Sequence, residues 1–82
     1  MNRFGEKLRI LREQHGFSLR DLGEMLVVSK NHVWNIEQGR KTPNIAMLIK
    51  IADIFGVTTD QLVRDELELD GYKHKAKQIT WE

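Results

Sequence analysis

From Phe4 onward, apolar residues recur along the chain at the three- and four-residue spacings of amphipathic helices. Phe4, Leu8 and Leu11 form the first stripe, with Ile10 beside it, and predict a helix over about residues 3–15. Gly16 follows directly, and glycine is the usual residue just after a helix end. The spacing therefore predicts a first helix that buries one apolar face.

Residues 16–39 have the pattern of two short helices joined by a tight turn. Ser18 is the expected N-cap of the first, with Asp21 three residues later as an Asp variant of the capping box. Ser29 is the expected N-cap of the second, which is about nine residues long. The positions expected to face inward are Leu22, Leu26, Val33 and Ile36. A second helix with amide and cationic side chains near its start has the geometry that enters a DNA major groove, so we interpret residues 18–38 as a helix-turn-helix unit.

Apolar spacing also predicts a fourth helix over about residues 44–55, ending at Gly56. Pro43 is expected in its first turn. Its inward stripe is predicted to comprise Ile45, Leu48, Ile51, Ala52 and Phe55. Met47, Ile49 and Ile54 add more apolar surface than one buried stripe needs, which indicates a surface for a partner.

A fifth helix is expected to start at a threonine N-cap, either Thr58 or Thr59. It contains Leu62 and Val63 and extends at most to Leu67. The pattern as a whole predicts an all-α domain.

The chain has 82 residues, no cysteine and a formal net charge of +1, which indicates one domain without disulfides or thiolate metal sites. No apolar run approaches the roughly 20 residues needed to span a bilayer, and no signal-peptide core is visible, so we expect a cytoplasmic protein with no membrane partner. The histidines lack metal-ligand spacing, and no phosphate-binding loop or nucleophile elbow is present. We therefore predict no enzyme activity, no metal and no cofactor.

Charge is distributed unevenly along the chain. Residues 1–20 and residues 29–50 each carry a net charge of +3, whereas residues 51–70 carry −5. A protein that lies on DNA phosphates needs cations only on the contacting face. The ordinary alternative is a set of solvated surface charges. Their segregation favours the first interpretation.

Residues 4–63 resemble the phage-repressor (Xre-type, Cro/repressor-like) helix-turn-helix family. The matching segments are FGEKLRILREQHGFSLRDLGEML, VSKNHVWNIEQGRKTPNIAMLIKIADIFGV and TTDQLV. The resemblance implies an all-α, compact five-helix lambda-repressor-like domain over residues 1–67, followed by a short C-terminal tail over residues 68–82. It also implies a bacterial or phage nucleoid-associated regulator of transcription, usually a repressor, that binds double-stranded DNA as a homodimer on a palindromic operator.

The resemblance assigns roles to matching positions. The implied base-reading residues are Lys30, Asn31 and Asn35, with Ser29, His32 and Trp34 beside them. The implied phosphate contacts are Ser18, Leu19, Arg20, Arg40, Lys41, Thr42 and Asn44. The implied dimer interface comprises Ile54, Val57, Thr59 and Leu62. An Arg12–Glu37 bridge is implied between the first and third helices.

The chemistry of the third helix suits base reading. Asparagine can bond adenine N6 and N7 together, and lysine can donate to guanine O6 and N7. On an isolated exposed helix face such residues are ordinarily only solvated, but their place in the second helix of this motif favours a reading role. Trp34 has two interpretations, contact with a sugar or thymine methyl at the groove wall, or packing on a neighbouring helix.

Two positions, Leu19 and Val27, depart from what the family usually carries. Leu19 replaces a glutamine that touches a phosphate. Gly23 occupies the position where the family carries a small residue, usually alanine, and is expected to let the two helices approach closely. Val27 replaces a glycine in the turn. Either the backbone at Val27 has a positive φ and is strained, or the turn has a different shape.

Residues 68–82 lie outside the resemblance. They are expected to form either a disordered terminus or a dimerisation arm, since Tyr72, Ile79 and Trp81 are apolar residues that are costly to leave in water. The main functional alternative is an antitoxin or other protein-interaction module of the same fold, which holds a toxin or another regulator and also controls its own operon. The exposed apolar residues of the fourth helix would then contact that partner.

Overall fold

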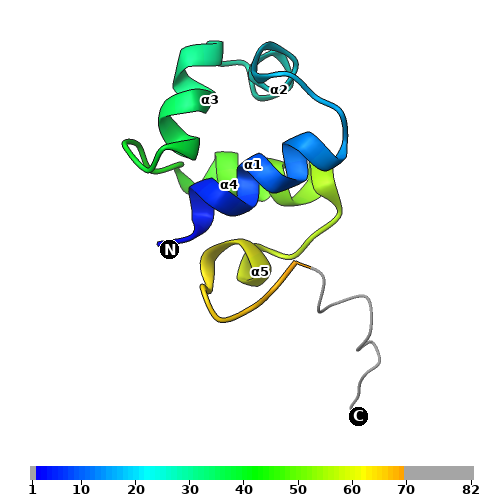
Figure 1. Cartoon of the computed structure of the whole chain (residues 1–82), viewed down its shortest axis with the longest axis vertical. Helices are drawn as coiled ribbons and strands as arrows, with labels where there is room; N and C mark the ends of the chain where they lie inside the picture. Colours follow the sequence, from blue (N-terminus) through cyan, green and yellow to red (C-terminus); the bar gives the residue numbers. More distant parts are fainter. Residues whose placement is uncertain (1, 70–82) are drawn as a thin grey trace.

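The computed structural model describes residues 2–69, and in this range the chain forms five α-helices and no strand. Their bounds are α1 (Phe4–Gln14), α2 (Leu19–Leu26), α3 (Lys30–Glu37), α4 (Ile45–Phe55) and α5 (Thr59–Val63). Figure 1 shows α1 crossing the middle of the molecule, with α2 and α3 at one end, α5 at the other and α4 behind α1. The predicted five-helix, all-α architecture is confirmed. The tail predicted over residues 68–82 lies outside the described residues from residue 70 onward.

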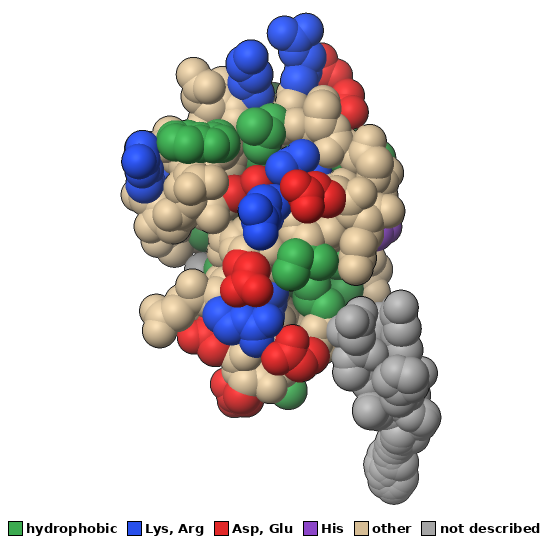
Figure 2. All heavy atoms as spheres, viewed as in Figure 1, with side chains coloured by type: hydrophobic (Ala, Val, Ile, Leu, Met, Phe, Trp, Pro, Cys, Tyr) green, Lys and Arg blue, Asp and Glu red, His purple; other side chains and the backbone are tan. Residues whose placement is uncertain are grey.

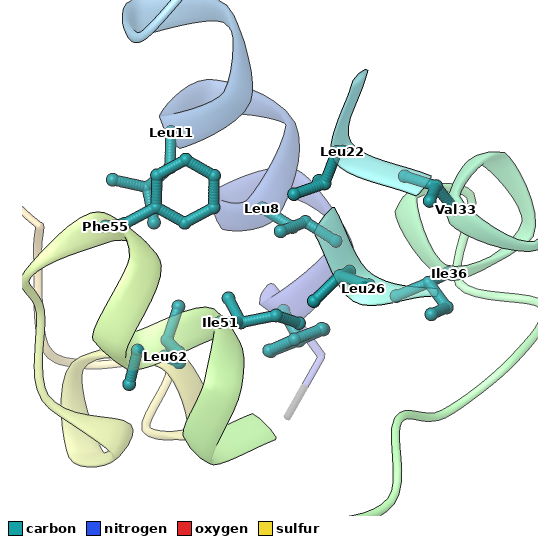
Figure 3. Packing of buried hydrophobic residues seen from close by; sticks show 11 residues of the cluster. Leu8, Leu11, Leu22, Leu26, Val33, Ile36, Ile51, Phe55 and Leu62 are labelled. Atoms are coloured by element: carbon teal, nitrogen blue, oxygen red, sulfur yellow. The ribbon is translucent and has the colours of Figure 1, made fainter. Parts of the chain in front are cut away.

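One hydrophobic core joins all five helices. Figure 3 shows side chains from each helix meeting at its centre. Leu8, Leu22, Val33, Ile51 and Leu62 are each 0% exposed. The remaining apolar members are Phe4, Leu11, Leu26, Ile36, Ala52 and Phe55. Full burial of an aliphatic side chain stabilises the fold by roughly 1.5–3 kcal/mol, so this cluster supplies most of the driving force for folding.

Short polar side chains start four of the helices. The Ser18 hydroxyl accepts from the Asp21 N–H at 3.0 Å, and the Asp21 carboxylate accepts from the Ser18 N–H at 2.9 Å. This reciprocal pair confirms the predicted capping box. The caps of α3, α4 and α5 are Ser29, Asn44 and Thr58. Thr58 rather than Thr59 is therefore the N-cap of the fifth helix.

Four helices are followed within two residues by left-handed backbone geometry. Three of the residues concerned are glycines, Gly16, Gly39 and Gly56, with φ between 68° and 80°. The fourth is Val27, with φ 60° and ψ 46°, and its side chain is 80% exposed. Of the two alternatives for the turn, the strained one is therefore correct. A β-branched residue is disfavoured in this conformation because its Cβ approaches the following carbonyl oxygen.

The first and last helices cap one another. The Asp65 carboxylate accepts from the backbone N–H groups of Asn2 at 3.1 Å and Arg3 at 2.9 Å, and the Arg3 bond holds the pKa of Asp65 below its ordinary value. The ammonium group of Lys7, which is 0% exposed, donates to three backbone carbonyls after and within α5. These belong to Gln61 at 2.5 Å, Arg64 at 2.7 Å and Leu67 at 2.6 Å. Burial lowers the pKa of Lys7.

Two expectations for α4 are wrong. Ile45 is the first residue of α4 and is 76% exposed rather than buried. Pro43 precedes the N-cap Asn44, so it lies before α4 rather than in its first turn. Ile51, Ala52 and Phe55 form the buried stripe as predicted.

We predict that Val27→Gly stabilises the protein. A left-handed backbone costs a residue with a Cβ about 1–2 kcal/mol, and the extra freedom of glycine in the unfolded chain offsets about 0.5–1 kcal/mol of that relief. The expected gain is therefore about 0.5–1 kcal/mol in the free energy of unfolding, or several degrees in Tm. Urea titration and thermal unfolding measure both.

Val27→Ala is the matched control, since it removes the branched side chain and keeps the Cβ. It should gain less than Val27→Gly. A loss of stability in the glycine variant would contradict the proposed strain.

Candidate nucleic-acid interface

The outer face of α3 carries most of the residues expected to read bases. Ser29, Lys30 and Asn31 are exposed, and His32 and Asn35 are half-buried. The opposite face is fixed in the core by Val33, Ile36 and Glu37, all of them buried. Since Asn31 and Asn35 are one turn apart, their side chains lie on the same face of the helix. The structure thus brings together the amide pair and leaves it open to a ligand.

The turn between α2 and α3 is closely packed because Gly23 has no side chain. A Cβ at this position would lie 2.8 Å from the carbonyl oxygen of Val28 and 3.3 Å from the backbone nitrogen of Lys30. The expectation that Gly23 allows close approach at the turn is therefore confirmed. The last turn of α2 is thereby packed directly against the start of α3.

Gly5 allows a second close approach, between α1 and the end of α3. A Cβ on Gly5 would meet the carbonyl oxygen of Glu37 and lie 2.7 Å from that of Ile36. Sequence reasoning missed this residue. The sequence did offer an indication of it. Gly5 stands inside a predicted amphipathic helix, next to the buried Phe4, at a position where a helix ordinarily favours alanine.

A paired cation and carboxylate complete the contact between α1 and α3. Nε of Arg12 lies 2.7 Å from Oε2 of Glu37, and Nη2 lies 3.1 Å from Oε1, so the bond is bidentate. Nη1 of Arg12 donates to the carbonyl of Phe17 at 3.0 Å. The side chains of Arg12 and Glu37 are 13% and 2% exposed respectively. The hydrogen bonds to Glu37 raise the pKa of Arg12. The implied bridge is present, and it joins the first helix to the expected reading helix.

Three of the cations counted in the net charge of residues 1–20 have partners within the protein. Arg3 pairs with Glu68 at 2.9 Å, Arg12 with Glu37, and Lys7 is buried beneath α5. The positive charge of residues 1–20 is therefore a poor measure of the contacting face. The exposed cations at the α2 and α3 end of the molecule and along α4 are Arg20, Lys30, Arg40, Lys41 and Lys50. In Figure 2, blue side chains project at the end where α2 and α3 lie, with red ones beside them, while at the end near α5 red side chains surround a blue cluster.

The expected phosphate-contacting residues occupy two helix starts and one loop. Ser18 and Arg20 are exposed at the start of α2, and Asn44 is exposed at the start of α4. Leu19 is half-buried and packs against the core, so its side chain faces the protein rather than solvent. Arg40, Lys41 and Thr42 are exposed in the loop after α3. Free backbone N–H groups at helix starts favour anions, which fits these positions.

The structure places the Trp34 ring against Arg40 rather than on a neighbouring helix, and the expected contact with DNA stays a prediction. Its ring lies under the guanidinium of Arg40, whose Cζ atom is 4.9 Å from the ring centroid, and the residue remains 39% exposed. The indole therefore packs against the loop that follows its own helix.

The expectation that Leu62 lies in the dimer interface is wrong. It is 0% exposed because α5 places it in the core of the single chain, so it presents no surface to a second copy. Ile54, Val57 and Thr59 are half-buried and keep part of their surface open.

Residues 2–69 contain neither a membrane-spanning helix nor a cluster of metal-ligating side chains. No described helix is long and apolar enough to cross a membrane. No group of three or more His, Cys, Asp or Glu side chains in this range is arranged to hold a metal ion.

Residues 3–67 match the protein family described as "Helix-turn-helix domain". The HTH-type transcriptional regulator SinR of Bacillus licheniformis is 33% identical over 70 residues, covering 82% of this chain and 63% of SinR. An HTH-type transcriptional regulatory protein of Pyrococcus furiosus is 37% identical over 76 residues, covering 93% of this chain and 22% of that protein. The chain thus spans between about a fifth and two thirds of the length of these relatives.

The structure is also similar to the N-terminal DNA-binding domain of SinR from Bacillus subtilis. The TM-score is 0.72 at 26% sequence identity, and the match covers 83% of this chain and all of that domain. Both the family and the fold are those of helix-turn-helix transcriptional regulators rather than of enzymes.

We predict that Glu37→Ala destabilises the protein by about 3–5 kcal/mol, because it leaves the Arg12 guanidinium buried without its carboxylate. Urea unfolding followed by circular dichroism measures the loss. The double variant Arg12→Met, Glu37→Leu should recover most of it, since an apolar pair removes both charges.

Glu13→Ala is the matched control for this prediction. Glu13 lies 4.0 Å from Arg12 and is 61% exposed, so its removal should change stability by less than about 1 kcal/mol. If Glu37→Ala were as mild as Glu13→Ala, the bridge would not be what holds α3 on α1.

Proposed function

Because the chain belongs to the Xre-type helix-turn-helix family, we propose that it binds double-stranded DNA through α3 and regulates transcription. The observation that carries this proposal is the outer face of α3. It presents Asn31 and Asn35 one turn apart and Lys30 at its start, on a helix fixed from behind by buried contacts. A rigid helix with exposed amide and ammonium groups is suited to the major groove.

The residues proposed to contact bases lie at the start and in the middle of α3. The amides of Asn31 and Asn35 can each make two hydrogen bonds to adenine, and Lys30 can donate to guanine. Ser29 and His32 flank them, although the Ser29 hydroxyl also accepts the His32 N–H at 3.0 Å as the helix cap. The side chains able to discriminate bases therefore occupy one stripe of the helix.

Phosphate contacts fall to the surroundings of α3. The start of α2, with Ser18 and Arg20, and the loop with Arg40 and Lys41 lie at the same end of the molecule as α3 (Figure 1). Thr42 and Asn44 extend this surface to the start of α4. At Leu19 only the backbone N–H remains available, since its side chain packs on the core. These contacts would fix the register of α3 on the duplex without reading sequence.

The finer proposal is a homodimer on a palindromic operator, acting as a repressor. Two copies of α3 would then enter successive major grooves about 34 Å apart. Ile54, Val57 and Thr59 are the candidate contacts between subunits, since they are near each other in the chain and partly exposed.

A second candidate function is a protein-interaction module, such as an antitoxin that also controls its own operon. The observation in its favour is apolar surface on α4, where Ile45 is 76% and Ile49 is 49% exposed. Soluble proteins tolerate single exposed apolar residues, so this observation ranks below the organised face of α3.

Selection from a random duplex pool at near-physiological salt, followed by sequencing, tests the proposed function. Recovery of an inverted repeat with half-sites about one helical turn apart is the expected result. Binding without an enriched sequence, or no binding, would contradict sequence reading. A protein partner captured by the α4 surface would then become the better explanation.

We predict that Asn31→Ala and Asn35→Ala each weaken binding to the selected site by roughly 1–3 kcal/mol and relax the preference at particular base pairs. Fluorescence anisotropy on the selected duplex and on its single-base variants measures both effects. Gln14→Ala is the matched control, because it removes an exposed amide from the end of α1. Unchanged affinity and base preference in both Asn variants would exclude α3 as the reading helix.

A further inference from the structure

The end of α3 has a geometry that fixes the position of Arg40. Gly39 has a φ of 80°, and its N–H donates to the carbonyl of Ile36 at 3.1 Å. The N–H of Arg40 donates to the carbonyl of Asn35 at 2.8 Å. This pair of bonds is the common helix ending at a left-handed glycine, and it folds the residue after the glycine back over the last turn. In such endings that residue usually makes an apolar contact with the last turn of the helix.

Here the returning side chain is a cation and the residue it meets is Trp34. The Arg40 guanidinium carbon lies 4.9 Å from the centroid of the indole ring, within the range of a cation–π contact. Tryptophan is the aromatic side chain that attracts a guanidinium most strongly. The backbone ending of α3 and the chemistry of the two side chains therefore support the same arrangement.

The partners of Arg40 differ from those of Arg3 and Arg12. Arg3 and Arg12 are held by the carboxylates of Glu68 and Glu37. Within the part of the chain that the structure describes, Arg40 makes no ion pair. The ring contact leaves the N–H groups of Arg40 without a carboxylate partner, whereas the carboxylate of Glu37 accepts from two N–H groups of Arg12. Arg40 is thus held in place while its donors remain available to an anion.

We propose that Trp34 is a positioning residue that holds the Arg40 guanidinium as a preformed phosphate clamp at the end of the reading helix. This inference rests on the proposed DNA-binding function, and it replaces the base contact first expected of Trp34. A free arginine loses rotamer freedom when it binds a phosphate, and an arginine already stacked loses less. Trp34 therefore contributes to affinity through Arg40, and it contributes nothing to base preference.

The stack itself can be tested without DNA. Ring current from Trp34 should shift the side-chain protons of Arg40 upfield in the NMR spectrum of the free protein, and Trp34→Ala should abolish that shift. An Arg40 with ordinary proton shifts in the unsubstituted protein would overturn the proposal.

A double-mutant cycle on the selected duplex tests the clamp. Trp34→Ala should weaken binding about 3- to 10-fold when Arg40 is present and by less than about 2-fold in an Arg40→Ala background. Trp34→Phe, which keeps a weaker ring face, should lie between Trp34→Ala and the unsubstituted protein. Thermal unfolding of each free variant shows whether the fold is retained.

Lys41→Ala is the matched control, since Lys41 is the neighbouring exposed cation and it is Arg40, not Lys41, that lies over the Trp34 ring. The effects of Trp34→Ala and Lys41→Ala should be additive. Trp34→Ala could instead reduce DNA affinity equally with Arg40 present and in the Arg40→Ala background, or it could change the base preference. Either outcome would overturn the clamp and assign Trp34 a direct DNA contact. If the unsubstituted protein also failed to bind DNA, that result would refute the proposed function, and the clamp would be refuted together with it.

Discussion

The orientation of α3 depends on the buried pair of Arg12 and Glu37. Glu37 is the last residue of α3 and is nearly inaccessible to solvent, so its carboxylate requires the two N–H groups that Arg12 supplies from α1. Gly5 brings the start of α1 against the same carbonyls that end α3. A misplaced α1 would leave a buried charge unpaired and two backbones in collision. The contacts of α3 with α1 therefore determine which face of α3 is turned to solvent.

The packing of α1 also separates the cations that stabilise the fold from the cations that remain in solvent. Arg3, Lys7 and Arg12 stabilise the fold, either paired with carboxylates or donating to the carbonyls beside α5. Arg20, Arg40 and Lys41 remain in solvent at the end of the molecule that carries α2 and α3. Net charge along the sequence does not separate these classes, since the separation arises only when the helices pack. An electrostatic argument about DNA therefore needs the three-dimensional arrangement.

Features set by near neighbours in the chain were predictable. The capping box at Ser18, the inward stripes of the first three helices and the glycine ends all depend on residues within about one turn. Features set by distant contacts were not. Ile45 has the spacing of a core residue but is exposed at the start of α4, and Leu62 is buried in the core of its own chain, where no partner can reach it. The role of Lys7 required knowing that α5 ends above α1. The base-reading assignments still rest on the family pattern and the exposure of α3.

The buried ammonium of Lys7 gives the fold a chemical reporter. Amine-reactive reagents modify the uncharged form of a lysine that solvent can reach, which Lys30, Lys41 and Lys50 satisfy in the folded protein. Lys7 is reached only when α5 and the following carbonyls leave α1, because its ammonium group donates to three backbone oxygens there. Its labelling rate, read by mass spectrometry, therefore counts openings at the α5 end, while the other lysines report the intact surface.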